Sequence, residues 1–397
     1  MKKTSLLLIS LTILSCTDSF KTEGTVLAWS NRPDPEFTAL ASELNGLILS
    51  EAPRNQSWNL LIKDPPTAPD LIVTELTQDV LKASSEGVLT DLSIYNGRFK
   101  SASQVYPGMA HLSQSSGITT FIPSSVLLWR LFYNQTVWKE LNLPLPSDLT
   151  QLEAAFEKLQ EKGIIPIALG SSFGWPALAW LSVLDLRYNG SQAHWALIHG
   201  KRDFSDPSLS PVFETLTRWR DKKYFDQVSG TINWPESLVK VQDGKAGFVF
   251  MGTSVVNRFG GDGAIISLPV PPLAGKKIEG ELAGIQGFIL KASSKFPEAA
   301  LALVDTYISR GSKGQTSDSY RISATRPAKG VVLEGIKAHQ AESLESGVEL
   351  HPTLDRILEP QAAYDVNLVM IRFFAPGSTM TGGDLAEALT AAMRSSK

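Results

Sequence analysis

The stretch PSDLTQLEAAFEKLQEKGIIPIAL, residues 146–169, contains the signals for one complete helix and for the strand that follows it. Asp148 suits the N-cap, and Gln151, three residues later, can return a hydrogen bond to the start of the helix. Gly163 suits the turn that ends the helix. The apolar side chains that share one helical face are Leu149, Leu152, Phe156 and Leu159. The short apolar run at 164–169 then predicts a buried strand.

The same alternation of short apolar runs, polar loops and helices recurs along the chain. Apolar runs at 26–29, 71–73 and 248–251 predict further strands. An amphipathic helix is predicted from about Phe37, and another over 297–308, where a proline stands at the first helical position. Because its strands alternate with helices, the chain is expected to have an α/β fold.

Length and charge restrict the organisation and the partners. The chain has 397 residues, of which 43% are hydrophobic and 19% are charged. That length exceeds one ordinary hydrophobic core and predicts two domains, which can be interleaved along the chain. The 37 Lys and Arg against 40 Asp and Glu leave a formal charge of −3. Without a broad positive field, the protein is not expected to bind nucleic acid.

The first residues have the composition of a secretory signal. Two lysines precede an apolar run at 6–14, which is too short to span a bilayer, and no transmembrane helix is predicted. The run ends in ILSC at 13–16, which resembles a bacterial lipobox, and Cys16 is the only cysteine of the chain. We expect residues 1–15 to be removed and 16–23 to form a lipidated cysteine with its tether. The alternative is an ordinary cleaved signal that includes a cysteine by chance.

Segments spread over nearly the whole mature region resemble one known family. The most specific is 146–169, which is similar to a helix followed by the strand "kLkekGitPial" in that family. The others, in chain order, are PDLIV at 69–73, GVLTDL at 87–92, 117–123, 131–134, WP at 175–176, DGKAGF at 243–248, QGFIL at 286–290 and SKFPEAA at 294–300. Together they resemble the maltose-binding-like lipoproteins that bind solutes for sugar ABC importers.

The resemblance implies a two-lobed periplasmic-binding-protein-like fold of type II, with a hinge and an interlobe cleft. Lobe one would comprise 24–127 and 268–310, and lobe two would comprise 128–267 and 311–397. A monomer would capture a small solute, a sugar or oligosaccharide, and deliver it to the transmembrane subunits of an ABC permease. It would be lipid-anchored at the cell envelope, facing the periplasm or the exterior, and would use no cofactor and catalyse no reaction. A solute sensor coupled to a receptor would have the same fold.

A cleft for a saccharide needs flat aromatic faces and hydrogen-bonding side chains. Trp29 stands beside Asn31 and Arg32 at the end of the first strand and offers both, unless its indole packs between sheet and helix. Glu75 follows the strand at 71–73, where it can accept hydroxyl protons or be a solvated carboxylate at a helix start. The other candidates for ligand binding in this part of the sheet are Ser125 and Gln286.

Further candidates belong to lobe two. The resemblance places the loop with Ser171, Ser172 and Trp175 at the cleft. Asn233 and Trp234 combine an amide with an indole just before a predicted helix, although the indole can instead be a hydrophobic staple of that helix.

The chain departs from the family's pattern at one place in lobe two. After the glycine that corresponds to Gly252, many family members have a tryptophan, but Thr253 follows here. A familiar aromatic platform for sugars is missing here, so the alternatives are that another tryptophan replaces it, that the solute is smaller or less like a saccharide, or that the family is right and the substrate class is not. Thr253 is also a candidate for ligand binding.

Two catalytic functions are alternatives to solute binding. GSSFG at 170–174 fits the pattern G-x-S-x-G, which would make Ser172 the nucleophile of a secreted lipoprotein hydrolase. No Gly-rich oxyanion segment precedes it, and Pro176 restricts the next helix, so a Gly/Ser loop at the cleft is the alternative. A glycosidase would need two carboxylates, such as Glu75 and another acid, and the sequence neither excludes nor supports such a pair.

Metal and nucleotide sites are not expected. His194 and His199 are five residues apart, which differs from the i, i+4 spacing of helical metal ligands. GGDG at 260–263 has neither the G-x-G-x-x-G pattern nor the Lys-Ser/Thr of a phosphate-binding loop, so it predicts a turn.

Overall fold

The computed structural model describes residues 26–30, 37–40, 47–51, 69–95, 105–115, 118–259, 263–314 and 320–394. The strands are β1 (Val26–Ser30), β2 (Leu47–Glu51), β3 (Leu71–Glu75), β4 (Gln114–Ser115), β5 (Ile118–Thr119), β6 (Phe121–Asn134), β7 (Ile165–Ile167), β8 (Ala246–Gly252), β9 (Ile265–Leu268), β10 (Gly280–Leu290), β11 (Ile322–Ser323) and β12 (Glu349–His351). Together with the helices they confirm the predicted α/β class.

The α-helices are α3 (Gln78–Ser85), α4 (Gln135–Glu140), α5 (Leu149–Glu161), α6 (Trp175–Ile198), α7 (Ser210–Asp221), α8 (Trp234–Gln242), α9 (Pro297–Ser312), α10 (Gly335–Glu345), α11 (Leu354–Ile357), α12 (Pro360–Phe373) and α13 (Gly382–Arg394). Short 3₁₀ helices cover Leu92–Tyr95, Pro107–Ser113, Pro207–Leu209 and Thr253–Arg258. None of the helices in the described ranges has both the length and the apolar content that a membrane crossing needs.

The helix and strand predicted over 146–169 form as α5 and β7. The Asp148 carboxylate accepts a hydrogen bond from the Gln151 amide at 2.8 Å, and Gln151 accepts one from the Ser147 amide. Gly163 ends the turn with φ of 71°, a left-handed conformation that favours glycine. β7 then pairs in parallel with β8, which brings α5 onto the sheet of lobe two.

One sheet runs through the whole molecule in the order β2-β1-β3-β10-β6-β8-β7. β1, β2 and β3 are parallel, and β10 runs antiparallel between β3 and β6. The long strand β6 is shared, because residues 121–128 pair with β10 and residues 129–132 pair with β8. β9 and β11 also pair with β6, and β12 pairs with β10.

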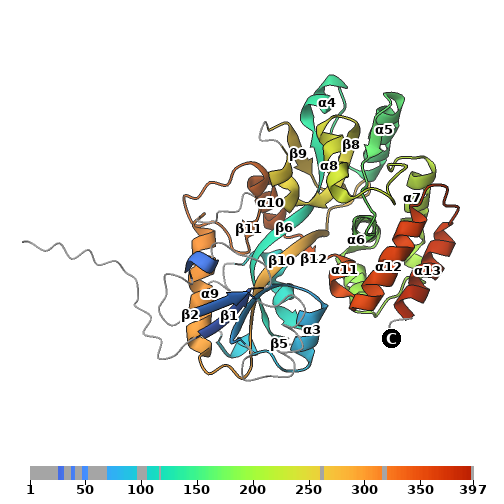
Figure 1. Cartoon of the computed structure of the whole chain (residues 1–397). Coiled ribbons are helices and arrows are strands. Elements are labelled where there is room, and N and C mark those ends of the chain that lie inside the picture. The colour runs from blue at the N-terminus through green and yellow to red at the C-terminus, as the bar shows by residue number, and fades with distance from the viewer. Residues whose placement is uncertain are drawn as a thin grey trace, which may run out of the picture.

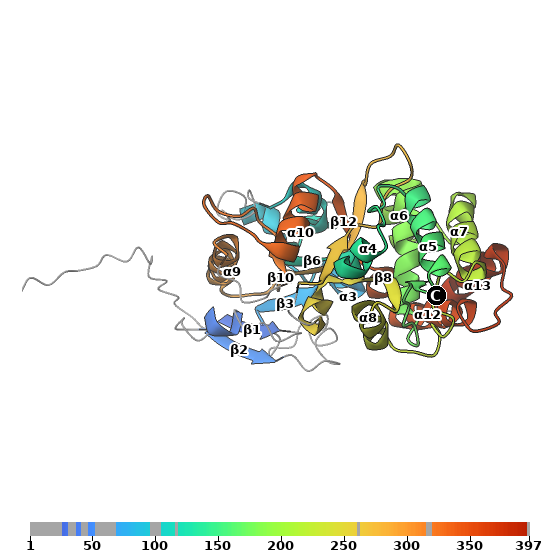
Figure 2. The same cartoon turned by 90° about the horizontal axis from the view of Figure 1, so that it is seen from above.

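The buried side chains divide the molecule into two lobes. One large core surrounds Phe156, Trp180 and Trp219 in lobe two. Two smaller cores, around Ile72 and Phe288, lie on the two faces of the sheet in lobe one. Figure 1 shows lobe one with β1 and α9 at the lower left and lobe two with α5, α7, α12 and α13 above and to the right, and Figure 2 separates the same two groups.

The chain crosses between these cores at three places in the described ranges. Neighbouring residues belong to different cores at Leu128/Trp129 in β6 and at Leu282/Ala283 in β10, and the third crossing lies between β12 and Leu354. The segment 320–350, which we expected in lobe two, packs with lobe one, because β11 pairs with β6 and β12 pairs with β10 beside the core around Ile72. Buried residues between 354 and 392 pack with the core of lobe two.

Candidate functional site

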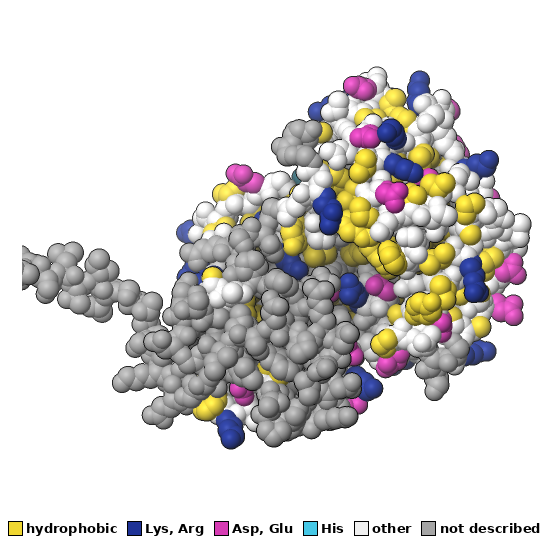
Figure 3. Space-filling model, viewed as in Figure 1, with side chains coloured by type: hydrophobic (Ala, Val, Ile, Leu, Met, Phe, Trp, Pro, Cys, Tyr) yellow, Lys and Arg dark blue, Asp and Glu magenta, His cyan; other side chains and the backbone are white. Residues whose placement is uncertain are grey.

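A cavity of about 180 Å³ lies where the three crossings meet. β6 contributes Leu127 and Trp129, β10 contributes Ala283, and the segment after β12 contributes Pro352 and Thr353. Residues from both lobes therefore line one space between them. Figure 3 shows that apolar side chains gather on the face where α8, β8 and α6 of lobe two lie.

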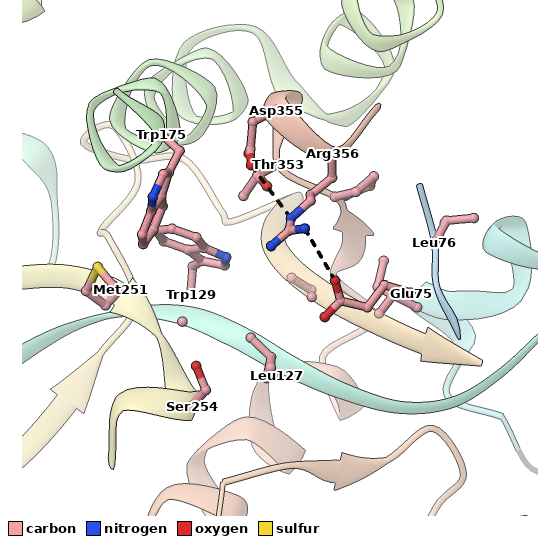
Figure 4. A pocket seen from close by; sticks show the side chains of 15 residues that line it. Glu75, Leu76, Leu127, Trp129, Trp175, Met251, Ser254, Thr353, Asp355 and Arg356 are labelled. Carbon is pink, nitrogen blue, oxygen red and sulfur yellow. Dashed lines mark ion pairs between the residues drawn. The ribbon is translucent and has the colours of Figure 1, made fainter. Parts of the chain in front are cut away.

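Two indoles form one side of the cavity. The rings of Trp129 and Trp175 lie 5.8 Å apart, centre to centre, at 81° to each other. Trp129 packs on Phe250 behind it, with 5.3 Å between ring centres, and the Trp175 ring lies 6.4 Å from that of Trp234. The two aromatic faces are therefore held by packing, and Figure 4 shows them on the same side of the space.

The backbone before α6 explains the position of Trp175. Gly174 is the N-cap of the helix with φ of 80°, and a Cβ built on it would lie 2.4 Å from the carbonyl oxygen of Asn367 in α12. Only glycine fits this close approach in a left-handed conformation. The turn thus places Trp175 at the first position of α6, facing the cavity, and Pro176 follows it as in many helix starts.

Three charged side chains stand opposite the indoles (Figure 4). Arg356 Nη1 lies 3.8 Å from Glu75 Oε2, and Arg356 Nε lies 3.6 Å from Asp355 Oδ2. Glu75 ends β3 of lobe one, while Asp355 and Arg356 belong to α11 of lobe two. Burial raises the pKa of the Asp355 carboxyl above its usual value; the Arg356 charge opposes this rise, and the Glu75 charge adds to it.

The cavity lining passes beside Thr253, the position at which the family resembled in sequence often has a tryptophan. Gly252 ends β8, and a Cβ on it would lie 2.9 Å from Leu127 Cδ1, so a larger residue would enter the cavity. Met251, which precedes Gly252, and Ser254, two residues after it, also line the space. Thr253, between Gly252 and Ser254, does not line the cavity: it is fully buried and donates its hydroxyl proton to the Tyr320 carbonyl or to Gln340.

The structure brings one lobe-one candidate to the cavity. Glu75 lines it, as described. Gln286 pairs with Glu75 across β10 and β3 but is buried in the sheet and does not line the cavity. Ser125 is its partner in β6; it is buried too, and its hydroxyl makes no hydrogen bond within the described chain. Trp29 lies in β1 with its side chain outside the description, and Asn31 and Arg32 lie outside the described residues.

The lobe-two candidates fall into two groups. Trp175 lines the cavity, whereas Ser171 and Ser172 are held by backbone hydrogen bonds to Ser229 and Ile232 and do not line it. Asn233 is the N-cap of α8: its side chain accepts from the Trp234 amide, and its own amide donates to Glu236. Trp234 contacts Trp175 and stacks under the guanidinium of Arg258 at 4.8 Å, adjacent to the cavity rather than in its lining.

The described histidine side chains have other partners than Ser172. His194 bonds to Asp185 at 2.8 Å, and His351 bonds to the Ser191 hydroxyl at 2.5 Å. His199 stacks on Trp195. A nucleophilic serine needs a hydrogen bond to a histidine that acts as its base. Among the described residues, Ser172 makes no hydrogen bond to a histidine. Within the same ranges, no three His, Cys, Asp or Glu side chains gather as a metal site would need.

Sequence reasoning missed most of the lining. Trp129 lies in the middle of a long buried strand, where a tryptophan is indistinguishable from a core residue. Asp355 and Arg356 follow β12, a strand of three residues with no readable periodicity. The signal that could have indicated them is a charged pair at the start of a short helix that follows a chain crossing. That crossing can be recognised only once the topology is known.

Comparison with known proteins gives the family. The profile described as "Bacterial extracellular solute-binding protein" matches residues 63–314, more than half of the chain. A relative from Pyrococcus horikoshii, described as an uncharacterized ABC transporter extracellular-binding protein, is 26% identical over 178 residues, which are 43% of this chain and 38% of the relative. The match thus spans well under half of that relative's length.

Solved structures confirm the two-lobed fold of maltose-binding-like proteins. The bacterial solute receptor AcbH, described as having an exclusive preference for β-D-galactopyranose, aligns with a TM-score of 0.83 at 18% identity, over 94% of this chain and 99% of that one. A probable secreted solute-binding lipoprotein from Streptomyces coelicolor aligns with a TM-score of 0.76 at 18% identity, over 93% and 98%. The profile match and the shared fold agree with the sequence resemblance, and the chain belongs to the bacterial extracellular solute-binding protein family.

Proposed function

We propose that this protein captures a small saccharide in the interlobe cavity and delivers it to the transmembrane subunits of an ABC importer. The observation that carries the proposal is the pairing of two indole faces, Trp129 and Trp175, with the charged groups around Arg356. An indole face suits the apolar C–H face of a sugar ring, and planar charged groups suit its hydroxyls. The described galactose preference of AcbH and the transporter description of the archaeal relative support it.

Closure of the two lobes would link binding to delivery. Glu75 belongs to lobe one, whereas Trp175 and Arg356 belong to lobe two, so a solute in the cavity touches both. Such a solute binds the closed arrangement more tightly than the open one and shifts the population toward it. The importer would recognise the closed arrangement and supply the ATP hydrolysis, while this protein acts as a monomer, without a cofactor and without catalysis.

The N-terminal residues would anchor the protein. Residues 1–15 would be cleaved, and Cys16 would carry the lipid that holds the folded lobes at the cell envelope. The description of the Streptomyces coelicolor protein as a lipoprotein supports this proposal. Metabolic labelling with a fatty-acid analogue tests it: Cys16→Ser should remove the label and release the protein from the membrane fraction. A label retained by Cys16→Ser would contradict it.

Binding is tested on the mature chain without its lipidated cysteine, residues 17–397, by thermal shift against sugars, oligosaccharides, amino acids and polyols. A saturable shift with a saccharide is expected, and calorimetry then compares variants. Trp175→Ala should weaken binding at least ~30-fold, because an aromatic anchor contributes about 2 kcal/mol. Tyr364→Ala is the matched control, since this exposed aromatic of α12 does not line the cavity.

Two results would contradict the proposal. One is wild-type affinity of a folded Trp175→Ala variant, which would show that the ligand binds outside this cavity. The other is the absence of any solute-induced shift together with ester hydrolysis that Ser172→Ala abolishes, which would favour the hydrolase.

A further inference from the structure

The indole nitrogen of Trp129 lies beside the interlobe cavity. Trp129 is only 7% exposed, and its ring packs 5.8 Å from that of Trp175 and 5.3 Å from that of Phe250, centre to centre. A Cβ built on Gly252, which lines the cavity, would lie 3.7 Å from Trp129 Nε1. The nitrogen therefore borders the space that the missing side chain of Gly252 leaves, although most of the ring is covered.

The backbone at Gly252 does not itself require a glycine. Its φ of −65° and ψ of 147° are values that any residue adopts. A side chain here would instead fill space, because its Cβ would lie 2.9 Å from Leu127 Cδ1 and its further atoms would extend over Trp129 Nε1. The glycine at this position thus keeps the indole N–H open to the cavity.

The N–H of Trp129 makes no hydrogen bond within the described part of the chain. Buried indole N–H groups usually have a partner, as Trp138 does in the Pro144 carbonyl at 3.4 Å. Trp180 lacks one too, but its nitrogen is enclosed in the core of lobe two. Trp129 combines an unpaired donor with a place beside the cavity, and such a donor costs free energy when water is removed from it.

The group that faces this nitrogen across the cavity is also a donor. Figure 4 shows the nitrogen of the Trp129 ring turned toward the guanidinium of Arg356, and both residues line the cavity. A guanidinium has N–H donors and no acceptor, so it cannot take the indole proton. Because no acceptor of the described lining is bonded to Nε1, a solute that displaces water from it has to supply one.

We propose that Trp129 is a specificity-determining residue, which donates its indole N–H to one hydroxyl oxygen of the bound saccharide. This inference rests on the proposed function, since it assigns how the same cavity distinguishes one saccharide from another. Trp175 supplies an apolar face for the ring, whereas Trp129 selects solutes that have an oxygen acceptor at one ring position. A deoxy sugar that lacks this hydroxyl leaves the enclosed N–H unpaired and binds more weakly.

Calorimetry on the mature chain at pH 7 tests the inference. The probes are glucose, galactose, mannose, maltose and cellobiose, followed by the monodeoxy analogues of the one that binds most tightly. Trp129→Phe keeps an aromatic ring and removes the N–H, so it should weaken binding of the parent sugar about three- to tenfold, as expected for one hydrogen bond. Trp138→Phe makes the same change outside the cavity lining and should leave the affinity unchanged.

The deoxy analogues identify the hydroxyl that Trp129 contacts. Removal of one particular hydroxyl should weaken binding about fivefold or more in the wild type. That loss should be at least about threefold smaller in Trp129→Phe, because the partner of the hydroxyl is already gone, and the losses at the other ring positions should be equal in both proteins.

Two variants at Gly252 test the N–H with the indole in place. Gly252→Ala adds a Cβ, and Gly252→Ser adds the same carbon with a hydroxyl oxygen that can accept the indole proton within the protein. Gly252→Ser should bind the parent sugar at least about threefold more weakly than Gly252→Ala, because its hydroxyl competes with the sugar for that proton. Equal affinities of the two variants would contradict the role assigned to the N–H.

Two further outcomes would overturn the inference and remain distinct. If Trp129→Phe binds like the wild type, or if it changes the loss at no deoxy position, while Trp175→Ala abolishes binding, then the cavity is a saccharide site but the indole N–H does not select the solute. If none of the saccharides binds, the proposed function fails and the inference fails with it.

Discussion

Replacing Glu281 by glutamine should destabilise the protein where its lobes meet. Glu281 lies in β10 beside the crossing into lobe one, with a side chain only 2% exposed. Its carboxylate lies 3.4 Å from Arg130 Nη1 of β6 and 3.8 Å from Arg187 Nη2 of α6. Both arginines are as deeply buried, so Glu281→Gln would leave two buried guanidinium groups without their anion.

The expected loss follows from what each arginine retains. Removing one partner of a buried ion pair costs about 3 to 5 kcal/mol. Arg130 keeps hydrogen bonds to the His339 carbonyl and to Ser343 of α10, and Arg187 keeps two to the carbonyls of Val270 and Gly280. These carbonyls partly solvate the charges, so we expect the lower end of that range, a loss of ~3 kcal/mol in the free energy of unfolding.

Urea unfolding followed by tryptophan fluorescence measures this loss, with Glu161→Gln as the matched control. Glu161 pairs with Lys158 at 3.0 Å on the surface of α5, where both side chains are about 60% exposed. Such a pair contributes less than about 0.5 kcal/mol. A loss in the free energy of unfolding below about 1 kcal/mol in Glu281→Gln, or one equal to that of the control, would refute the argument that Glu281 stabilises the two buried arginines.

Three further predictions concern the site and the element that first indicated the fold. Because the pKa of Asp355 is raised in the folded protein, Asp355→Asn should raise the melting temperature of the empty protein at neutral pH. This gain should shrink as the pH falls below the folded-state pKa, and a gain that is the same at every pH would contradict the assignment. Gly174→Ala should both destabilise the protein and weaken saccharide binding, because the added Cβ would lie 2.4 Å from the Asn367 carbonyl oxygen. Thermal shift measures the stability and calorimetry the affinity, and no change in either would show that the turn tolerates a side chain. Asp148→Ala should cost ~1 kcal/mol in urea unfolding through loss of the N-cap of α5, with affinity unchanged, and a loss of affinity would link that helix to the cavity.

Local signals predicted the elements that have a strong period. The helix over α5 and the strand β7 could be read from caps and apolar spacing, because these depend on neighbours in the sequence. The two-residue β11 and three-residue β12 have no such period, so nothing local indicated that 320–350 returns to lobe one. Long-range pairing with β6 and β10 decides that placement.

Only the residues of the candidate site that have a local sequence signal could be predicted. Glu75 and Trp175 each follow a turn signal at the end of a strand or the start of a helix, which marks the edge of a sheet. Trp129 has the sequence context of a core residue, and it reaches the cavity only because β6 leaves one lobe at that residue. Asp355 and Arg356 are brought to Glu75 across some 280 positions by the third crossing, which no local pattern reveals.

The central claim is that a saccharide is held between the two lobes, in the cavity at their crossings. A crystal structure of the mature chain with the saccharide that gives the largest thermal shift tests it most directly. We predict density for a sugar ring against Trp175 and Trp129, within hydrogen-bond distance of Arg356 and Glu75. Density for the sugar elsewhere on either lobe, with this cavity filled by water alone, would contradict the account.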